Sequence, residues 1–137
     1  MGTIIRTADA AGVDAIINLK GCVDIYNPKV IRSTMGSIFD MNIIQCTQED
    51  ALRVLKDNNF EIVSSYLNTD NYYNTVDYTN KVALVIGNEA NGVNDELIDK
   101  SDTLVKIPYG REFNASLSAA SAATMFAYEI MRQNYEK

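Results

Sequence analysis

Apolar and polar residues alternate along the chain in blocks that predict strands and helices in turn. The apolar runs of strand length are Asp14–Leu19, Met41–Gln45, Glu61–Leu67, Val82–Ile86 and Thr103–Ile107. The segments with helical spacing are Ile4–Ala11, Lys29–Phe39, Thr47–Asn58, Asn94–Lys100 and Asn114–Gln133. Such alternation predicts an α/β fold, a parallel sheet with helices on both faces.

Local signals mark where several of these elements begin and end. Gly12 is placed to end the first helix, and Thr47 to cap the helix that follows it. The polar, Tyr-rich segment Asn68–Asn80 predicts a loop, and the apolar run Val82–Ile86 predicts a strand buried on both faces. In the second helix we expect an inward-facing set, namely Val30, Ser33, Thr34 and Ile38.

The composition bounds the class of protein. A chain of 137 residues with 47% hydrophobic residues predicts one globular domain, residues 1–137, with a single core. No apolar run approaches the roughly 20 residues that span a bilayer, and no secretory signal is visible. We therefore expect no membrane partner, a cytoplasmic protein, and free core thiols at Cys22 and Cys46. Without histidine the chain offers no histidine base, and we expect no metal.

Charge is unevenly distributed along the chain. The net charge is −6, which argues against a strong grip on nucleic acid by this domain alone. Residues 1–33 carry four basic and three acidic side chains, a balance of +1, and the other residues carry 8 basic and 15 acidic side chains, a balance of −7. Any RNA-facing surface is therefore expected near the first basic cluster.

Two junctions in the second half stand out. In Val85–Val93 and in Ile107–Gly110, which is followed by Asn114–Ala120, an apolar run breaks into a glycine-bearing loop and then enters a predicted helix. Neighbouring junctions of this kind can build one ligand pocket at the carboxyl end of a parallel sheet.

With a third segment, Gly2–Val13, and the connecting pattern Asp24-x-x-Asn27-x-Lys29-x-x-Arg32-Ser33, these junctions appear in one order. The order resembles that of the motifs of the SpoU (TrmH) family of SPOUT RNA methyltransferases, over essentially the whole chain. The resemblance implies methyl transfer from S-adenosylmethionine to a ribose 2′-hydroxyl of rRNA or tRNA. It also implies a carboxyl-terminal trefoil knot that holds the methyl donor, and a homodimer, formed through the knot region, whose active site spans both subunits.

The resemblance assigns catalytic roles to four residues. Arg6 matches the arginine of the first motif. In the family this arginine is proposed to act on the 2′-hydroxyl, either as a base or by orienting it beside the RNA phosphate. Because arginine is a poor base, we favour phosphate clamping and hydroxyl orientation as at least part of its role. Glu89 matches the acidic residue of Gly-x-Glu-x-x-Gly, and Asn114 and Ser116 match Asn-x-Ser. Alternative roles are a solvated arginine, a loop carboxylate and helix caps.

The resemblance also places a set of residues at the methyl donor, where glycines let the backbone approach a ligand. The set comprises Thr47, Ile86, Gly87, Asn88, Gly92, Ile107, Pro108, Phe113, Ser116 and Leu117. An ordinary strand-to-helix turn at the glycines, and a cap at Thr47, are the competing interpretations. Lys29 and Arg32, with Arg6, are candidates for RNA phosphates; for the first two an ordinary helix surface pair is an equal alternative.

The chain departs from the family pattern at two places. The family's first strand, the asparagine of its first motif and its separate amino-terminal RNA-binding domain are expected to be missing, which leaves a sheet edge exposed. Only Tyr109–Phe113 separates Pro108 from Asn114, and Phe113 falls where a leucine normally covers the donor. These departures motivate a second hypothesis, a dimeric domain that binds donor or RNA without turnover. A third, an unrelated nucleotide-binding domain, lacks a Gly-x-Gly-x-x-Gly or Walker-type loop.

Overall fold

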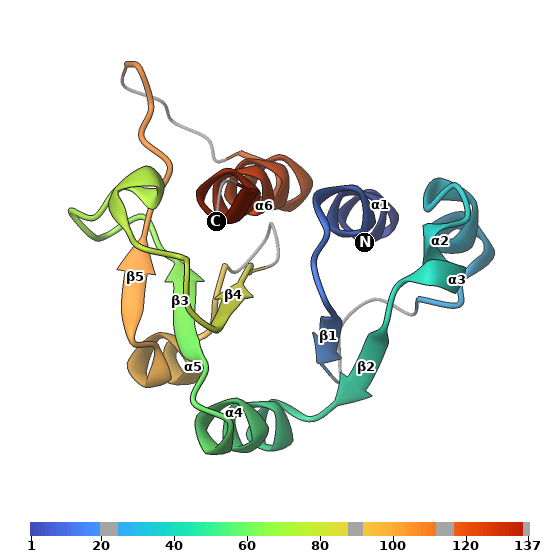
Figure 1. Ribbon diagram of the computed structural model, residues 1–137, viewed down its shortest axis with the longest axis horizontal. Coiled ribbons are helices and arrows are strands. Elements are labelled where there is room, and N and C mark those ends of the chain that lie inside the picture. The colour runs from blue at the N-terminus through green and yellow to red at the C-terminus, as the bar shows by residue number, and fades with distance from the viewer. Residues whose placement is uncertain (20–24, 88–91, 112–116, 136–137) are drawn as a thin grey trace.

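The computed structural model describes residues 1–19, 25–87, 92–111 and 117–135, and its helices and strands alternate along the chain (Figure 1). The strands are β1 (Ile16–Leu19), β2 (Ile43–Cys46), β3 (Glu61–Ser65), β4 (Val82–Val85) and β5 (Thr103–Val105). The helices are α1 (Gly2–Ala11), α2 (Pro28–Ser33), α3 (Ser37–Asp40), α4 (Gln48–Asp57), the 3-10 turn η1 (Tyr73–Thr75), α5 (Asp95–Lys100) and α6 (Ala119–Tyr135). The α/β prediction is confirmed.

The described strands form two parallel sheets in place of the one that we expected. One sheet has the order β1-β2, and the other has the order β4-β3-β5. All of the pairings between these strands are parallel. Within the described residues β1, β2, β4 and β5 each pair along one edge only, and the expected absence of a family strand stays a prediction.

Strand β3 organises the core, because successive side chains of a strand point to opposite faces. Ile62 and Val63 are both fully buried, each on its own face. Ile62 packs with Leu52 of α4 and Leu97 of α5. Val63 packs with Phe126 of α6. Helices on both faces of the sheet are therefore confirmed, and Figure 1 shows α4 and α5 on one side of β3 and α6 on the other.

Strand β4 is less buried than its apolar sequence predicted. Each of its four residues is only half-buried. It pairs with β3 through register partners such as Val63 and Leu84, but no described strand pairs with its other edge. The prediction of complete burial was wrong. An apolar sequence indicates that a strand tends to be buried, but its actual burial depends on whether another strand packs beside it.

The predicted second helix, Lys29–Phe39, is interrupted. Helix α2 ends at Ser33, and Met35 and Gly36 adopt positive φ values of 55° and 94° before α3 begins. Of the predicted inward-facing residues, Thr34 is fully buried and Val30 is half-buried, but Ser33 is exposed; the side chain of Ile38 lies outside the described part. Left-handed backbone ends a helix whatever the side-chain pattern suggests.

Capping signals were accurate at some ends and misleading at one. Gly12 ends α1 with φ 77°, and Thr47 Oγ1 accepts a hydrogen bond from Asp50 N at 3.2 Å at the start of α4. The last helix begins at Ala119, later than the predicted Asn114. Ser118 Oγ accepts from Ser121 N at 3.0 Å, so Ser118 acts as the cap at the start of α6.

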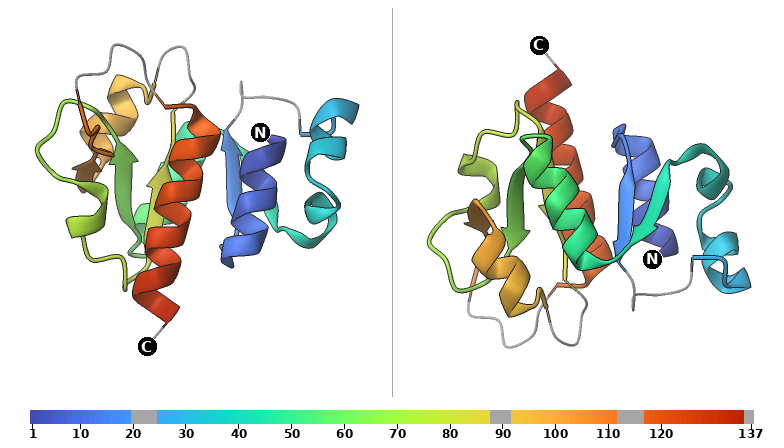
Figure 2. Two further views of the ribbon diagram at one scale, coloured as in Figure 1. Left: turned by 90° about the horizontal axis from the view of Figure 1, so that it is seen from above. Right: turned by 90° about the horizontal axis from the view of Figure 1, so that it is seen from below.

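Helices α1 and α6 lie side by side in all views (Figures 1 and 2). The hydroxyls of Thr7 and Thr124 are 3.4 Å apart across this contact, and Ile5 of α1 is fully buried. Short side chains let the helices approach closely. Across the described ranges no helix combines the length and hydrophobicity needed to cross a bilayer.

The carboxyl-terminal half of α6 is fastened to the loop before β4. Gln133 Nε2 donates to Val76 O at 2.8 Å, and Gln133 Oε1 accepts from Tyr78 N at 2.7 Å. Tyr78 is almost fully buried and donates its hydroxyl to Tyr73 O at 2.5 Å. Burial, followed by the nearby Glu129 carboxylate, raises the pKa of Tyr78 to about 12. The phenol is thus held neutral as a hydrogen-bond donor.

Two carboxylates are stabilised in their charged form. Arg132 Nε and Nη2 donate to the buried Glu129 at 2.9 and 2.6 Å, which lowers the pKa of Glu129. The backbone N–H of Ile62 donates to Asp102 Oδ2 at 2.8 Å, and this bond, assisted by Lys56, lowers the pKa of Asp102. Asp102 ties the loop between α5 and β5 to strand β3, and the buried Glu129 is bonded within α6. Because folding lowers both pKa values, the ionisation of both carboxylates is linked to folding.

The first prediction concerns the fastening of α6. Gln133→Ala removes two hydrogen bonds to buried backbone and should lower the free energy of unfolding by about 1–3 kcal/mol. The matched control is Arg53→Ala, which removes the exposed ion pair to Asp50 and should cost less than about 1 kcal/mol. Urea unfolding of both variants measures the difference. Equal losses would show that the Gln133 contacts do not hold α6.

The stability of the fold should depend on pH in the acidic range. A pKa lowered by folding stabilises the fold above the unfolded value, near about 4, and this stabilisation is lost as pH falls through the folded value. Thermal unfolding should therefore show declining stability from pH 5 toward pH 2, and Asp102→Asn together with Glu129→Gln should flatten that decline. A wild-type melting temperature that stays constant over this range would contradict the assignment.

Candidate functional site

The carboxyl ends of β3, β4 and β5 meet at one edge of their sheet, because all three strands are parallel. Gly87 follows β4 and Ile107 follows β5. The left panel of Figure 2 shows β1, β3 and β4 directed toward the same edge, where α6 also begins. The two junctions singled out in the sequence are therefore brought together, as expected of a ligand site in an open α/β sheet.

Gly87 and Gly92 form the tightest backbone approach at this edge. A Cβ at Gly87 would overlap the backbone of Gly92 and Val93 and would lie 2.6 Å from Gly92 O. Gly92 has φ 66°, a conformation that favours glycine. The two glycines thus allow their backbone segments to approach closely at this edge.

Apolar residues of both junctions share one core cluster. Ile107 is buried in the same cluster as Phe126 of α6, and the half-buried Ile86 packs against that cluster. Pro108 and Leu117, in contrast, are exposed. The structure therefore places the isoleucines beneath the start of α6, with the next residues along the chain at the surface.

Thr47 lies on the α4 side of the same edge. Its neighbour Gln48 exchanges two hydrogen bonds with Asn94, Nε2 to Oδ1 at 3.4 Å and Nδ2 to Oε1 at 2.6 Å. Asn94 comes two residues after Gly92 and caps α5 by accepting from Leu97 N at 2.9 Å. Thr47 is exposed and serves as a cap, so the capping interpretation is confirmed, and a role at the donor stays a prediction.

Arg6 projects from the exposed side of α1. The opposite side of this helix buries Ile5 and Ala8. Among the described side chains no carboxylate forms an ion pair with Arg6. Its guanidinium is thus not committed to an acidic partner in the described part of the chain, which suits a residue that meets an anionic ligand.

Lys29 and Arg32 lie one turn apart on α2, and both are exposed. Figure 1 shows α2 on the side of α1 that faces away from α6. A Cβ at Gly2 would meet Ser33 Cβ at 2.8 Å, so α1 and α2 are in close contact. The structure therefore separates this basic pair from the glycine junction and leaves α1, with Arg6, between them.

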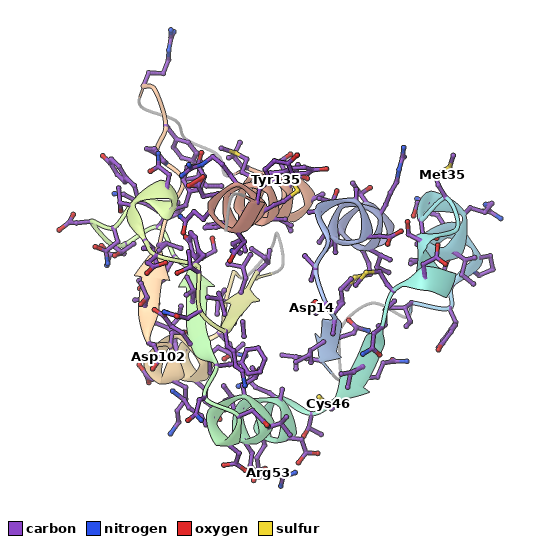
Figure 3. The ribbon with its side chains drawn as sticks, viewed as in Figure 1. Asp14, Met35, Cys46, Arg53, Asp102 and Tyr135 are labelled. Atoms are coloured by element: carbon purple, nitrogen blue, oxygen red, sulfur yellow. The ribbon has the colours of Figure 1, made fainter. Side chains whose placement is uncertain are left out.

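Five predicted site residues lie outside the described ranges, and their assignments stay predictions. They are Asn88, Glu89, Phe113, Asn114 and Ser116. Cys22 also lies outside these ranges, and Cys46 is a half-buried free thiol at the end of β2 (Figure 3).

Sequence reasoning missed the residues that hold this edge in place. Lys106 N donates to Asn71 O at 2.9 Å, and Tyr73 N donates to Lys106 O at 2.8 Å, which pairs the chain before Ile107 with the loop that Gln133 fastens. No local signal marks Gln133, because its partner Val76 is 57 residues away.

The chemistry available here is that of backbone groups, an arginine and polar side chains. In the part of the chain that the structure describes, no cluster of three or more His, Cys, Asp or Glu is placed to hold a metal ion.

Comparison of the sequence with known proteins shows which family the chain resembles. The model of the SpoU rRNA methylase family matches residues 1–128. The chain is 34% identical over 131 residues to the 23S rRNA (guanosine(2553)-2′-O)-methyltransferase RlmP of Bacillus subtilis strain 168, covering 95% of this chain and 52% of that protein. It is 33% identical over 137 residues to a putative TrmH family tRNA/rRNA methyltransferase of Staphylococcus aureus strain COL, covering 99% and 55%. The chain thus spans about half the length of these relatives.

Solved structures agree. The AdoMet-bound rRNA methyltransferase from Sinorhizobium meliloti superposes with a TM-score of 0.91 at 36% identity, over 96% of this chain and 50% of that one. The SpoU methyltransferase AviRb from Streptomyces viridochromogenes, solved in complex with the cofactor AdoMet, superposes with a TM-score of 0.93 at 30% identity, over 99% and 56%. The resemblance found in the sequence motifs is confirmed, and the chain belongs to the SpoU rRNA methylase family.

Proposed function

We propose that the chain transfers a methyl group from S-adenosylmethionine to a ribose 2′-hydroxyl of rRNA or tRNA in the cytoplasm. The observation that carries the proposal is the backbone approach of Gly87 to Gly92 at the carboxyl edge of the sheet. This approach lies in a chain whose relatives include a named 2′-O-methyltransferase and structures with bound AdoMet.

The residues at this edge fit such a donor. The missing side chain of Gly87 lets the backbone of Gly92 and Val93 approach, and at Gly92, where no heavy atom lies within 4 Å of a Cβ position, the backbone is open to a nucleoside. Ile86, which precedes Gly87, and the exposed Leu117 are proposed to offer apolar surface for a purine ring. When bound, the donor supplies an electrophilic methyl group on a sulfonium. Under this proposal the donor-binding residues are Thr47, Ile86, Gly87, Asn88, Gly92, Ile107, Pro108, Phe113, Ser116 and Leu117.

Arg6 is proposed to clamp an RNA phosphate and orient the 2′-hydroxyl. Its exposed guanidinium presents donors in a rigid fork that matches phosphate oxygens, whereas a guanidinium keeps its proton and is a poor base. Glu89, Asn114 and Ser116 complete the proposed catalytic group by positioning Arg6 and the ribose. Holding the hydroxyl in line with the methyl group accounts for much of the rate that such a site can supply.

Lys29 and Arg32 are proposed to add phosphate contacts beyond Arg6. They lie on α2, on the side of α1 that faces away from α6. RNA that contacts both this pair and the glycine junction would therefore cross the exposed face of α1. Contacts of this kind position a nucleic acid without reading its sequence.

The proposal includes a trefoil knot and a homodimer through the knot region. The fastening of α6 to the loop around Tyr78 through Gln133 supports a terminal helix held by an earlier loop. The exposed side of α6 carries Met125 and Tyr128, apolar surface that suits a subunit contact. Sedimentation of the purified chain tests the dimer, and a monomer with full activity would contradict the shared site.

The experiment that tests donor binding is calorimetric titration with S-adenosylhomocysteine, the reaction product that occupies the donor's place. Gly87→Ala should weaken this binding at least about tenfold, because its methyl group cannot be placed without moving Gly92. Gly110→Ala is the matched control, since no heavy atom lies within 4 Å of a Cβ there. Saturable wild-type binding that Gly87→Ala leaves unchanged would show that the pocket lies elsewhere.

A further prediction separates catalysis from binding. Arg6→Ala should reduce methyl transfer to RNA by about 100-fold or more, because it removes a charged donor from the reacting group, and should leave the affinity for S-adenosylhomocysteine within about twofold. Arg53→Ala, an exposed arginine on α4 (Figure 3), is the control and should retain activity. If Arg6→Ala loses product binding instead, Arg6 is part of the donor pocket and not of the catalytic group.

A further inference from the structure

Helix α2 is unusual in this fold because it buries none of its side chains. It is nevertheless well defined. Asn27 Oδ1 accepts from Lys29 N at 2.9 Å, Pro28 occupies the first turn, and Ser33 Oγ donates to Val30 O at 2.9 Å. Figure 1 shows α2 at the outer side of the molecule, against α1. Apart from Val30 and Ile31, which are half-buried, the side chains of this short helix are exposed and face water or a binding partner.

Four of the exposed residues along this segment have long or aromatic side chains and are spaced three residues apart. They are Tyr26, Lys29, Arg32 and Met35. The tyrosine is 65% exposed and the methionine is 73% exposed, among the largest exposures of apolar side chains in the described part of the chain. Figure 3 shows Met35 at the outer end of α2, directed away from the core. We call these four residues the α2 surface.

The charge of the α2 surface contrasts with that of the chain. Lys29 and Arg32 are the only charged residues in the segment 25–37, which Asp24 and Asp40 flank, whereas the whole chain carries −6. An acid-free basic segment in an acidic protein is complementary to a polyanion.

Met35 provides an independent observation. It adopts φ 55°, which a residue with a Cβ reaches only at a cost, and its side chain gains no burial in return. Glycine, which stands at the next position, would adopt this conformation freely. A strained, solvent-facing thioether is the arrangement expected when the side chain is retained for a contact outside the fold.

We propose that the α2 surface binds unpaired nucleotides of the substrate RNA, with Tyr26 and Met35 against nucleobases and Lys29 and Arg32 on the adjoining phosphates. This inference rests on the proposed function and adds the form of RNA that is recognised. Aromatic rings stack on the faces of bases, and these faces are available in single strands and loops but covered in an A-form duplex. The central position of the two cations favours RNA over an apolar protein partner.

The binding test compares a fluorescent single-stranded RNA of about 12 nucleotides with a hairpin whose stem pairs the same sequence, by anisotropy with the full chain. The single strand should bind more tightly. Tyr26→Ala should weaken single-strand binding about tenfold, and Tyr135→Ala, an 80% exposed tyrosine at the end of α6, should leave it unchanged. Equal effects of the two substitutions, or equal wild-type affinity for strand and hairpin, would overturn the proposal.

Salt dependence separates the two kinds of contact. Lys29→Ala should reduce the slope of log affinity against log salt by about 0.7, the contribution of one phosphate of a single strand, whereas Tyr26→Ala should lower affinity at an unchanged slope. A change of slope for Tyr26→Ala would contradict a stacking role.

Met35→Gly gives a readout that a structural role would not produce. It relieves the positive φ, so the melting temperature should rise, and it removes the thioether, so RNA binding should fall. A stabilised variant that binds RNA like the wild type would overturn the role of Met35. A change in oligomeric state of Tyr26→Ala or Met35→Gly would assign the surface to a protein contact instead. Titration of each variant with S-adenosylhomocysteine tests the donor site separately. A wild-type chain that does not bind this product would count against the proposed function, whereas the RNA comparisons test the α2 surface.

Discussion

The burial of Ile62 and Val63 on opposite faces of β3 is the constraint on which the described structure depends. Of the described strands β3 alone has neighbours on both edges, and these two residues are fully buried. One face gathers α4 and α5, and the other gathers α6. Because β4 and β5 take their register from β3, the same strand decides that Gly87 and Ile107 emerge at one edge.

Helix α6 connects the core around β3 to the candidate site. Phe126 anchors its middle in the core, and Gln133 fastens its end to the loop that pairs with the chain before Ile107. The start of the helix is thereby held over the carboxyl edge of the sheet. A site built from backbone at glycines depends on this kind of support, since backbone groups are positioned only by the elements on either side of them.

Local signals predicted those parts of the fold that local interactions determine. Thr47 and Gly12 mark helix ends correctly because a side-chain oxygen and a left-handed glycine act within a few residues. The helix break at Met35 was not predicted because methionine seldom adopts positive φ. The half-burial of β4 was not predicted because the residues that would bury a strand come from elsewhere in the chain. The glycine junction was predictable as a motif, whereas the fastening of Gln133 to a loop 57 residues away was not, because nothing near Gln133 marks its partner.

Whether the chain methylates a ribose hydroxyl can be measured with a labelled methyl donor. The purified chain is incubated with S-adenosylmethionine labelled in its methyl group and with unmodified rRNA and tRNA, and the RNA is then hydrolysed in alkali. A methylated 2′-oxygen cannot attack the neighbouring phosphate, so we expect label in alkali-resistant dinucleotides. Label confined to mononucleotides would place the methyl group on a base and contradict the claim, as would transfer to neither RNA by a folded chain that binds the donor.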